Sequence, residues 1–168
     1  MPLRTARHDI ALIAALLTTA ENEARALGDP EPGAEHLLVA ALLVDDPSAR
    51  DALEVVPSSR DAPSVDAAAV RAAIDAVHAE ALAAVSITVD EQPQPLPPSR
   101  GVYRSEVSTQ EVFQQARQLA RRSPTGLRSA HVLLAVAERE HGTAARVLQR
   151  LGLERASVID AAHRALDD

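Results

Sequence analysis

The side chains of this chain that could carry acid–base or metal chemistry are six histidines and the aspartates and glutamates. Cysteine is absent, which removes thiol nucleophiles, disulfides and thiolate metal sites. Two histidines, His36 and His131, each begin a strongly apolar segment. The other four have no partner four residues away and no carboxylate at a zinc-like spacing: His8, His78, His141 and His163. The pattern predicts neither a metal site nor a cofactor.

Catalytic motifs are also missing. A convergent Ser-His-Asp triad stays open, because its members meet in space and not in sequence order. However, the chain has no Gly-x-Ser-x-Gly, and its serines cluster at loops and expected helix starts, where turn and cap chemistry accounts for them. Without lysine, no Gly-x-x-x-x-Gly-Lys-Ser/Thr phosphate loop is possible. We therefore predict no catalytic residues, and hydrolase activity would need a pocket that the sequence does not display.

The charge distribution indicates protein partners and no nucleic acid. The formal net charge is −7, and acidic residues alternate with arginines without forming a basic stripe. The alternative function is a transcriptional or DNA-associated regulator, whose binding would weaken steeply with added salt. Its nearest candidate for a basic recognition helix spans an expected helix end and a loop: Arg117, Arg121, Arg122 and Arg128.

One apolar stretch bears on membrane association. The segment from Ile10 to Leu17 is too short to span a bilayer. It is followed by Glu21, Glu23 and Arg25, and it lacks a convincing signal-peptide cleavage site. We therefore predict a cytoplasmic protein with no membrane partner.

Hydrophobic periodicity predicts an all-helical chain. Hydrophobic residues make up 46% of the sequence, and most of the excess is alanine, which favours closely packed helices. Apolar positions three and four residues apart mark one face of each expected helix. Asp46 is expected to cap a helix that starts at Pro47, and Ser105 or Ser108 is expected to cap another. The expected helices cover about 7–27, 34–44, 47–56, 64–85, 105–120, 129–138 and 143–151, with a last one through 158–166.

A proline-rich segment divides the chain into two halves. Residues 92–98 read Gln-Pro-Gln-Pro-Leu-Pro-Pro, and these prolines cannot continue a helix and favour an extended linker. We predict a first unit over residues 1–85, a linker over 86–104 and a second unit over 105–168.

The two halves repeat each other. Aligning His36 with His131 pairs residues 36–56 with 131–151 without a gap. The apolar pairs in this register are Leu38 with Leu133, Ala40 with Ala135, Ala49 with Ala144, Leu53 with Leu148 and Val56 with Leu151. Two histidines that met in space could form a pH switch or a metal site. Duplication of a structural residue explains the match more simply, so we expect both imidazoles to serve packing and hydrogen bonding.

Two motifs, one in each half, resemble those of a known family. Residues 33–38 read Gly-Ala-Glu-His-Leu-Leu, and residues 142–148 read Gly-Thr-Ala-Ala-Arg-Val-Leu. They are similar to the Gly-Thr-Glu-His-Ile/Leu-Leu and Gly-Val-Ala-Ala-Arg-Val-Leu signatures of the double-repeat N-terminal domain of bacterial Clp unfoldases of the ClpA, ClpB and ClpC type. The resemblance covers nearly the whole chain. It implies an all-α fold of about eight helices, in two pseudo-symmetric four-helix repeats packed as one Clp N-domain.

The resemblance also implies a ligand site. In ClpC-type relatives, the glutamate of each Glu-His pair is implied in binding phosphorylated arginine, whose guanidinium can donate hydrogen bonds to a carboxylate. Glu35 keeps this residue, next to Ala34, whereas the second repeat has Ser129 and Ala130 at the same positions. Only one of the two sites could therefore survive in that form. Alternatively, Glu35 caps its helix and complements the helix dipole.

A protein-contact surface is implied as well. The family's surfaces for substrates and antibiotic peptides often include aromatics near the start of the first helix and in the segment that joins the repeats. Here the first-helix position is Asp9, and the joining segment offers Val89 and, nearby, Tyr103. Phe113 lies on the apolar face of its helix, so we expect it in the core.

The resemblance implies a non-catalytic protein- or peptide-binding module of the Clp protease system, without the ATPase modules of the unfoldases. Its expected partners are Clp unfoldase components, protein substrates or adaptors, and cyclic-peptide antibiotics. It would serve a ClpC-type unfoldase as an adaptor or compete with it as a decoy. The two roles differ in whether the chain contacts the unfoldase.

Overall fold

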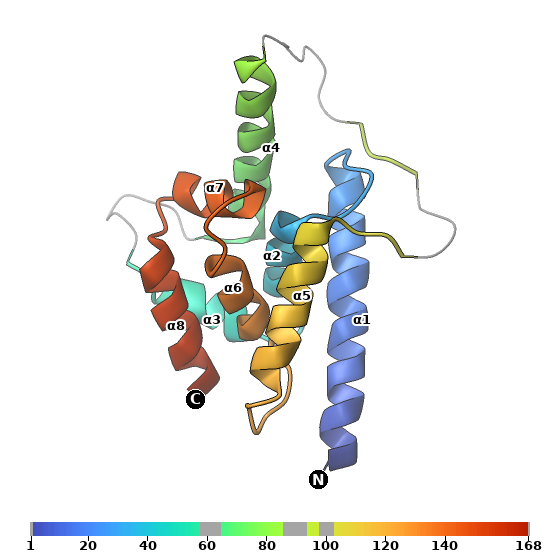
Figure 1. Ribbon diagram of the computed structural model, residues 1–168, viewed down its shortest axis with the longest axis vertical. Coiled ribbons are helices and arrows are strands. Elements are labelled where there is room, and N and C mark those ends of the chain that lie inside the picture. Colours follow the sequence, from blue (N-terminus) through green and yellow to red (C-terminus); the bar gives the residue numbers. More distant parts are fainter. Residues whose placement is uncertain (1, 58–64, 86–93, 98–102, 168) are drawn as a thin grey trace.

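The structure is a computed structural model that describes residues 2–57, 65–85, 94–97 and 103–167 of the chain. These residues form eight α-helices and no strand (Figure 1), which confirms the predicted all-helical fold. No helix in these ranges is long and apolar enough to cross a membrane. The helices are α1 (Pro2–Ala26), α2 (Ala34–Leu43), α3 (Ser48–Glu54), α4 (Ala67–Ala84), α5 (Val107–Ala120), α6 (Ser129–Ala137), α7 (Thr143–Arg150) and α8 (Arg155–Asp167).

The two most apolar helices, α2 and α6, form the centre of the molecule. Every residue of α6 is buried, and in α2 all residues but Leu43 are buried. Helix α1 packs on α2, α5 packs on α6, and α2 and α6 contact each other. Complete burial of one leucine side chain contributes about 1.5–3 kcal/mol. Paired leucines at the middle of each helix, Leu37 with Leu38 and Leu133 with Leu134, therefore anchor the core.

Helix contacts follow the same order in both halves. Helix α3 packs against α6 and α8, and its counterpart α7 packs against α2 and α4. Each short helix thus lies against the central helix of the other half. This exchange joins the halves into one core and confirms the two pseudo-symmetric four-helix repeats.

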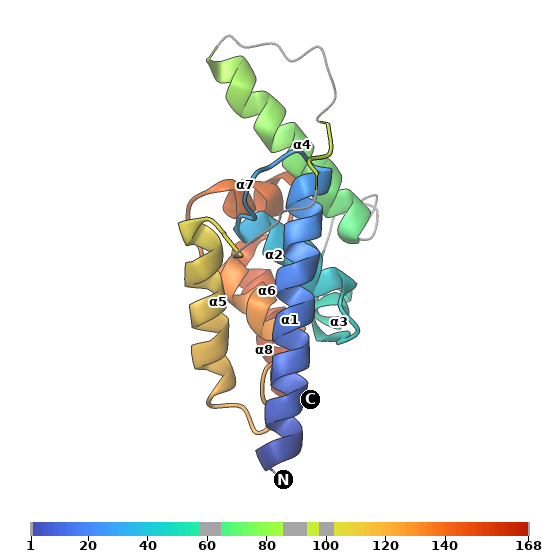
Figure 2. The same cartoon turned by 90° about the vertical axis from the view of Figure 1, so that its right-hand side faces the viewer.

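Helix α4 departs from the symmetry at its C-terminal end. Near its start, Arg71 donates hydrogen bonds to both carboxylate oxygens of Glu23 in α1, at 2.6 and 2.8 Å. Beyond Val77 the helix projects from the body of the molecule (Figures 1 and 2), and residues 81–85 are all exposed. Its alanine content favours helix even without packing. The counterpart α8 packs along α6 and α3.

Capping differs from the sequence-based expectation at two helix starts. Helix α3 begins at Ser48, so Asp46 lies two residues before it, and Pro47 takes the N-cap position without a side-chain cap. Neither Ser105 nor Ser108 caps α5, which begins at Val107 without a side-chain cap. The predicted cap positions were wrong, although Asp46 Oδ1 does accept a hydrogen bond from Ser48 N, the first residue of α3. Ser108 lies inside α5, and its hydroxyl accepts from Ala34 N of α2.

The described part of the joining segment runs beside the end of α1. Residues 94–97 are exposed, and Leu96 N donates a hydrogen bond to Arg25 O at 3.0 Å. The predicted division into 1–85, 86–104 and 105–168 stays a prediction. Residues 86–93 and 98–102 of the predicted linker lie outside the described residues.

Candidate functional site

The duplicated histidines close the N-termini of α2 and α6. His36 Nδ1 accepts a hydrogen bond from Gly33 N at 2.9 Å, and His131 Nδ1 accepts one from Arg128 N at 3.0 Å. Both rings are buried. Each histidine satisfies a backbone N–H just before its helix, which is the role of glutamate or glutamine in a capping box. This confirms the structural interpretation of the two histidines.

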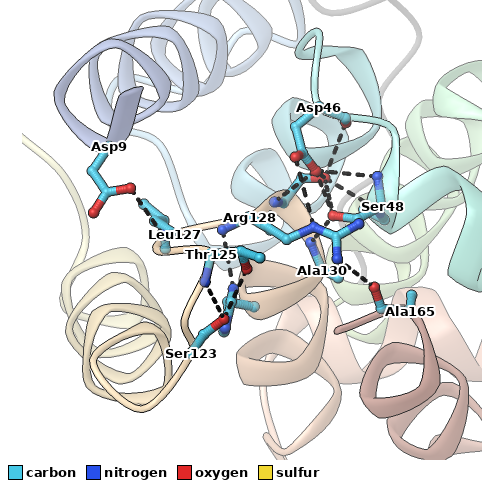
Figure 3. Close-up of polar contacts among 12 residues, drawn as sticks. Asp9, Asp46, Ser48, Ser123, Thr125, Leu127, Arg128, Ala130 and Ala165 are labelled. Atoms are coloured by element: carbon cyan, nitrogen blue, oxygen red, sulfur yellow. Dashed lines mark hydrogen bonds and ion pairs between the residues drawn. The ribbon is translucent and has the colours of Figure 1, made fainter. Parts of the chain in front are cut away.

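The N-termini of α3 and α6 meet and cap each other (Figure 3). The Ser48 hydroxyl accepts a hydrogen bond from Ala130 N at 2.9 Å, and the Ser129 hydroxyl accepts one from Ala49 N at 3.0 Å. Asp46 Oδ1 joins the two helices, because it accepts from the backbone N of Ser48 and of Ser129, each at 3.1 Å, and from both hydroxyls. We name this set of residues the α3–α6 junction.

The α3–α6 junction places one carboxylate at the positive ends of two helices. Burial alone would raise the pKa of Asp46, but hydrogen bonds from Ser129 and Ser48 together outweigh it, so the pKa lies below its ordinary value. Arg128 adds a cation whose Nε lies 4.0 Å from Asp46 Oδ2 and whose Nη1 donates to Ala165 O at 2.8 Å. Ser129 and Ala130 of α6 were both predicted to bind a ligand, but both are buried in this junction.

The equivalent N-termini of α2 and α7, which we name the α2–α7 junction, lack the reciprocal serine caps that join α3 to α6. An offset of 95 residues places Thr143 where the other junction has Ser48, and Ala34 where it has Ser129. Ala34 has no hydroxyl to offer, and its backbone N donates instead to Ser108 Oγ of α5 at 3.2 Å. Among the described residues, α7 has no side-chain cap. The two repeats therefore use different side chains to cap the equivalent helix N-termini.

Glu35 lies at the N-terminus of α2 itself. Its side chain folds back over Gly33, and its Oε1 lies 3.4 Å from His36 Nδ1. Burial raises the pKa of Glu35, and a hydrogen bond from its own backbone N–H partly offsets that effect. The residue is 5% exposed. In this conformation the carboxyl group lies over the start of the helix and offers little surface to a ligand.

A second carboxylate, that of Asp29, lies next to Nε2, the other ring nitrogen of His36. Asp29 Oδ2 lies 3.2 Å from His36 Nε2 and 3.9 Å from His78 Nδ1 of α4. Because His36 Nδ1 accepts a hydrogen bond, the proton of the neutral ring is on Nε2 and faces Asp29. In the described ranges, no group of three or more His, Cys, Asp or Glu side chains could hold a metal ion.

Both aromatic residues of the chain line one pocket between α1 and α5, which we name the aromatic pocket. Tyr103 is half-buried, and burial together with nearby Glu21 raises the pKa of its hydroxyl to about 12. Phe113 is partly buried and packs against the core, as predicted, while it also reaches this pocket. The volume is about 500 Å³. The lining residues are Leu17, Glu31, Tyr103, Arg104, Ser105, Thr109, Gln110 and Phe113.

The other two predicted contact residues are not in the aromatic pocket. Asp9 lies near the start of α1, where its Oδ1 accepts a hydrogen bond from Leu127 N at 3.0 Å (Figure 3). This bond ties the first turns of α1 to the loop between α5 and α6. Val89 lies outside the described residues.

The four arginines that suggested a DNA-binding helix do not form one surface. Arg117, Arg121 and Arg122 are exposed around the C-terminal end of α5. Arg128 instead turns toward Asp46 and the end of α8. The set is thus divided between an exposed helix end and a structural junction.

The α3–α6 junction and the aromatic pocket were not predicted from the sequence. A signal for the junction was present in the repeat alignment, because Ser48 and Thr143 place a hydroxyl at the first position of both short helices. For the pocket, the resemblance pointed to Tyr103 alone. Its walls come from distant segments, with Leu17 and Glu31 on one side and Tyr103 on the other.

Comparisons with known proteins agree with this arrangement. A model of the Clp repeat (R) N-terminal domain matches residues 13–151. The fold is similar to a solved structure, the N-terminal domain of the caseinolytic protease associated chaperone ClpD from Arabidopsis thaliana. That match has a TM-score of 0.61 and 18% sequence identity, and it covers 94% of this chain and 93% of the other. A search of curated proteins found no match.

Proposed function

This chain belongs to the Clp repeat (R) N-terminal domain family, and we propose that it is a non-catalytic module that docks protein substrates or adaptors for a ClpC-type unfoldase. In Clp unfoldases, domains of this family bind substrates and adaptors. The observation that carries the proposal is the aromatic pocket, which gathers the one tyrosine and the one phenylalanine of the chain.

The aromatic pocket has the chemistry of a peptide-docking site. Tyr103 and Phe113 supply large apolar surfaces, and aromatic anchors in such pockets carry much of the binding energy in protein interfaces. Glu31 and Arg104 at the same pocket offer charges of both signs that would orient an extended segment. A volume of about 500 Å³ lies within the usual range for ligand pockets. We infer that the pocket accepts apolar side chains of an unfolded protein segment.

Binding of fluorescein-labelled casein, an unstructured protein, tests this proposal by fluorescence anisotropy. Tyr103→Ala is expected to weaken binding about tenfold, as loss of an aromatic anchor does. Val107→Ala is the matched control, because Val107 is an exposed apolar residue of the same region outside the pocket. Failure of the wild type to bind, or equal binding by both variants, would contradict the proposal.

The finer ligand proposal concerns the α2–α7 junction. We propose that Glu35, with Ala34, recognises phosphoarginine. Ser129 and Ala130 hold the equivalent positions in the second repeat, but they are buried in the α3–α6 junction, so we propose no phosphoarginine site there. Recognition would require the Glu35 side chain to turn outward from Gly33. Calorimetric titration with phosphoarginine and with arginine tests this. The wild type is expected to bind phosphoarginine but not arginine, and Glu35→Ala is expected to abolish this binding. If the wild type does not bind phosphoarginine, the proposed role of Glu35 is wrong.

The adaptor and decoy roles make opposite predictions for a ClpC-type unfoldase. An adaptor binds the unfoldase and accelerates degradation of a casein substrate when added in excess. A decoy competes for the substrate and slows its degradation without binding the unfoldase. Degradation assays with the wild type separate the two roles by the sign of the effect. Tyr103→Ala should lose the effect in both cases, because both depend on the aromatic pocket.

A further inference from the structure

A second pocket lies across the molecule from the aromatic pocket. Figure 2 shows α5 and α3 on opposite sides of α1, and the second pocket is formed where α3 meets the end of α2 and the start of α4. Its volume is about 420 Å³, and we name it the α3 pocket. Its lining residues are Leu42, Leu43, Arg50, Leu53, Glu54, Val56, Val65, Asp66, Ala67, Ala68 and Leu153.

The α3 pocket is apolar inside and open at an exposed leucine. Leu53, Val56 and Leu153 line it and are each about 4–5% exposed, so they belong to the core of the molecule. Leu43 is 43% exposed and is the one residue of α2 that is not buried. A single exposed leucine is ordinary on a protein surface. An exposed leucine that adjoins an apolar hollow provides a continuous surface for a partner's side chain.

The charged residues at this pocket leave it acidic. The one arginine in the pocket lining, Arg50, binds backbone carbonyl groups. Its Nη1 donates to Leu42 O and to Val44 O, both at 2.8 Å, at the C-terminal end of α2. Glu54 is exposed and forms no ion pair among the described residues. Asp66 accepts one hydrogen bond as the N-cap of α4 and places a second carboxylate at the pocket.

We propose that the α3 pocket binds an extended segment of a protein partner in which a leucine-sized apolar side chain stands next to arginine or lysine. The apolar side chain would pack on Leu43 and the pocket wall, and the cation would lie beside Glu54. A second copy of this chain fits less well, because its net charge of −7 repels an acidic pocket.

This site is separate from the aromatic pocket, so one molecule can hold two partners at once. Such an arrangement suits a module that connects two proteins. The inference goes beyond the proposed function, because it concerns other residues on another side of the molecule. It holds or fails independently of casein binding.

A charge-reversal experiment tests the α3 pocket. The probes are two fluorescein-labelled synthetic peptides, one with leucines flanked by arginines and one with the same leucines flanked by glutamates. The arginine peptide is expected to bind the wild type, and Leu43→Asn is expected to weaken it about tenfold. Glu54→Arg should weaken the arginine peptide and strengthen the glutamate peptide. Ile10→Asn on α1, another exposed apolar residue, is the matched control and should bind as the wild type does.

Several outcomes would overturn the proposal. One is failure of the arginine peptide to bind, and another is binding that ignores Leu43 and Glu54. Equal binding of both peptides by the wild type would also contradict it. Sedimentation that shows dimers lost in Leu43→Asn would assign the pocket to a second copy and not to a basic partner. Tyr103→Ala should leave the arginine peptide unaffected, which distinguishes failure here from failure of the casein experiment.

Discussion

The two repeats bring a pair of helix N-termini together at equivalent points and complete them with different chemistry. At the α3–α6 junction, Asp46 accepts the amide and hydroxyl hydrogens of Ser48 and Ser129. At the α2–α7 junction, the residue in the place of Asp46 is the exposed His141, and Ala34 stands where the other junction has a serine. Both junctions begin a buried central helix, so the difference in capping groups does not come from a difference in burial.

The comparison shows how a duplicated fold can divide structural and binding roles. Unpaired N–H groups at a helix N-terminus attract anions, and a protein can satisfy them from within or leave them to a ligand. The α3–α6 junction supplies its own anion in Asp46. At the α2–α7 junction the Ser108 hydroxyl accepts from Ala34 N, and the nearby carboxyl group is that of Glu35. Burial disfavours the charged form of Glu35.

Removing the shared carboxylate is expected to have the largest effect. Asp46→Ala leaves the amides of Ser48 and Ser129 without their acceptor and should lower the free energy of unfolding by about 3 kcal/mol. Urea unfolding measures the change. Asp45→Ala, at an exposed neighbour, is the control and should cost less than about 0.5 kcal/mol. Because the pKa of Asp46 is lowered in the folded state, its contribution is present above the ordinary value of 3.8 and is lost as pH falls through the folded pKa.

Ser129→Ala makes the α3–α6 junction resemble the α2–α7 junction. Its hydroxyl accepts from Ala49 N and donates to Asp46, so its loss should cost about 1–2 kcal/mol, less than loss of Asp46. The same urea experiment ranks the two variants. Equal stability of Ser129→Ala and the wild type would show that the reciprocal serine caps contribute nothing beyond packing.

His131 should make the second repeat sensitive to mild acid. Burial lowers the pKa of His131 below the ordinary 6.5, so the unfolded chain binds the proton more readily than the folded chain. Its contribution to stability is therefore full above 6.5 and is lost as pH falls through the folded pKa. His131→Gln keeps a capping acceptor but does not titrate, and should show a smaller loss of stability between about pH 7.5 and pH 5.5. An unchanged loss in this variant would remove His131 as its source.

The smallest expected effect is a gain of stability at Glu35. Because burial raises the pKa of Glu35, its contribution is full below the ordinary 4.5 and is lost as pH rises through the folded pKa. Glu35→Gln keeps the shape without the charge and should stabilise the fold at neutral pH by less than about 1 kcal/mol. Thermal unfolding at pH values on both sides of 4.5 measures this. A clear loss of stability at neutral pH would mean that the charge serves the helix N-terminus.

The sequence predicted the helices and their repetition better than it predicted the polar contacts. The apolar periodicity that defines α2 and α6 is local, and the offset between His36 and His131 exposed the duplication. Asp46 was expected to cap α3, but its carboxylate also serves a helix that begins 83 residues later. Such contacts depend on how the halves pack, which local spacing does not encode. The folded-back carboxylate of Glu35 likewise depends on burial that only the assembled fold provides.

The central claim, that the aromatic pocket docks unfolded protein segments, is tested most directly by nuclear magnetic resonance. The chain has one tyrosine and one phenylalanine, so selective labelling of these rings places two reporters in the pocket. Titration with unlabelled casein should shift the Tyr103 and Phe113 ring signals together, to saturation, with the affinity found by anisotropy. Casein binding that leaves both ring signals unchanged would contradict the claim.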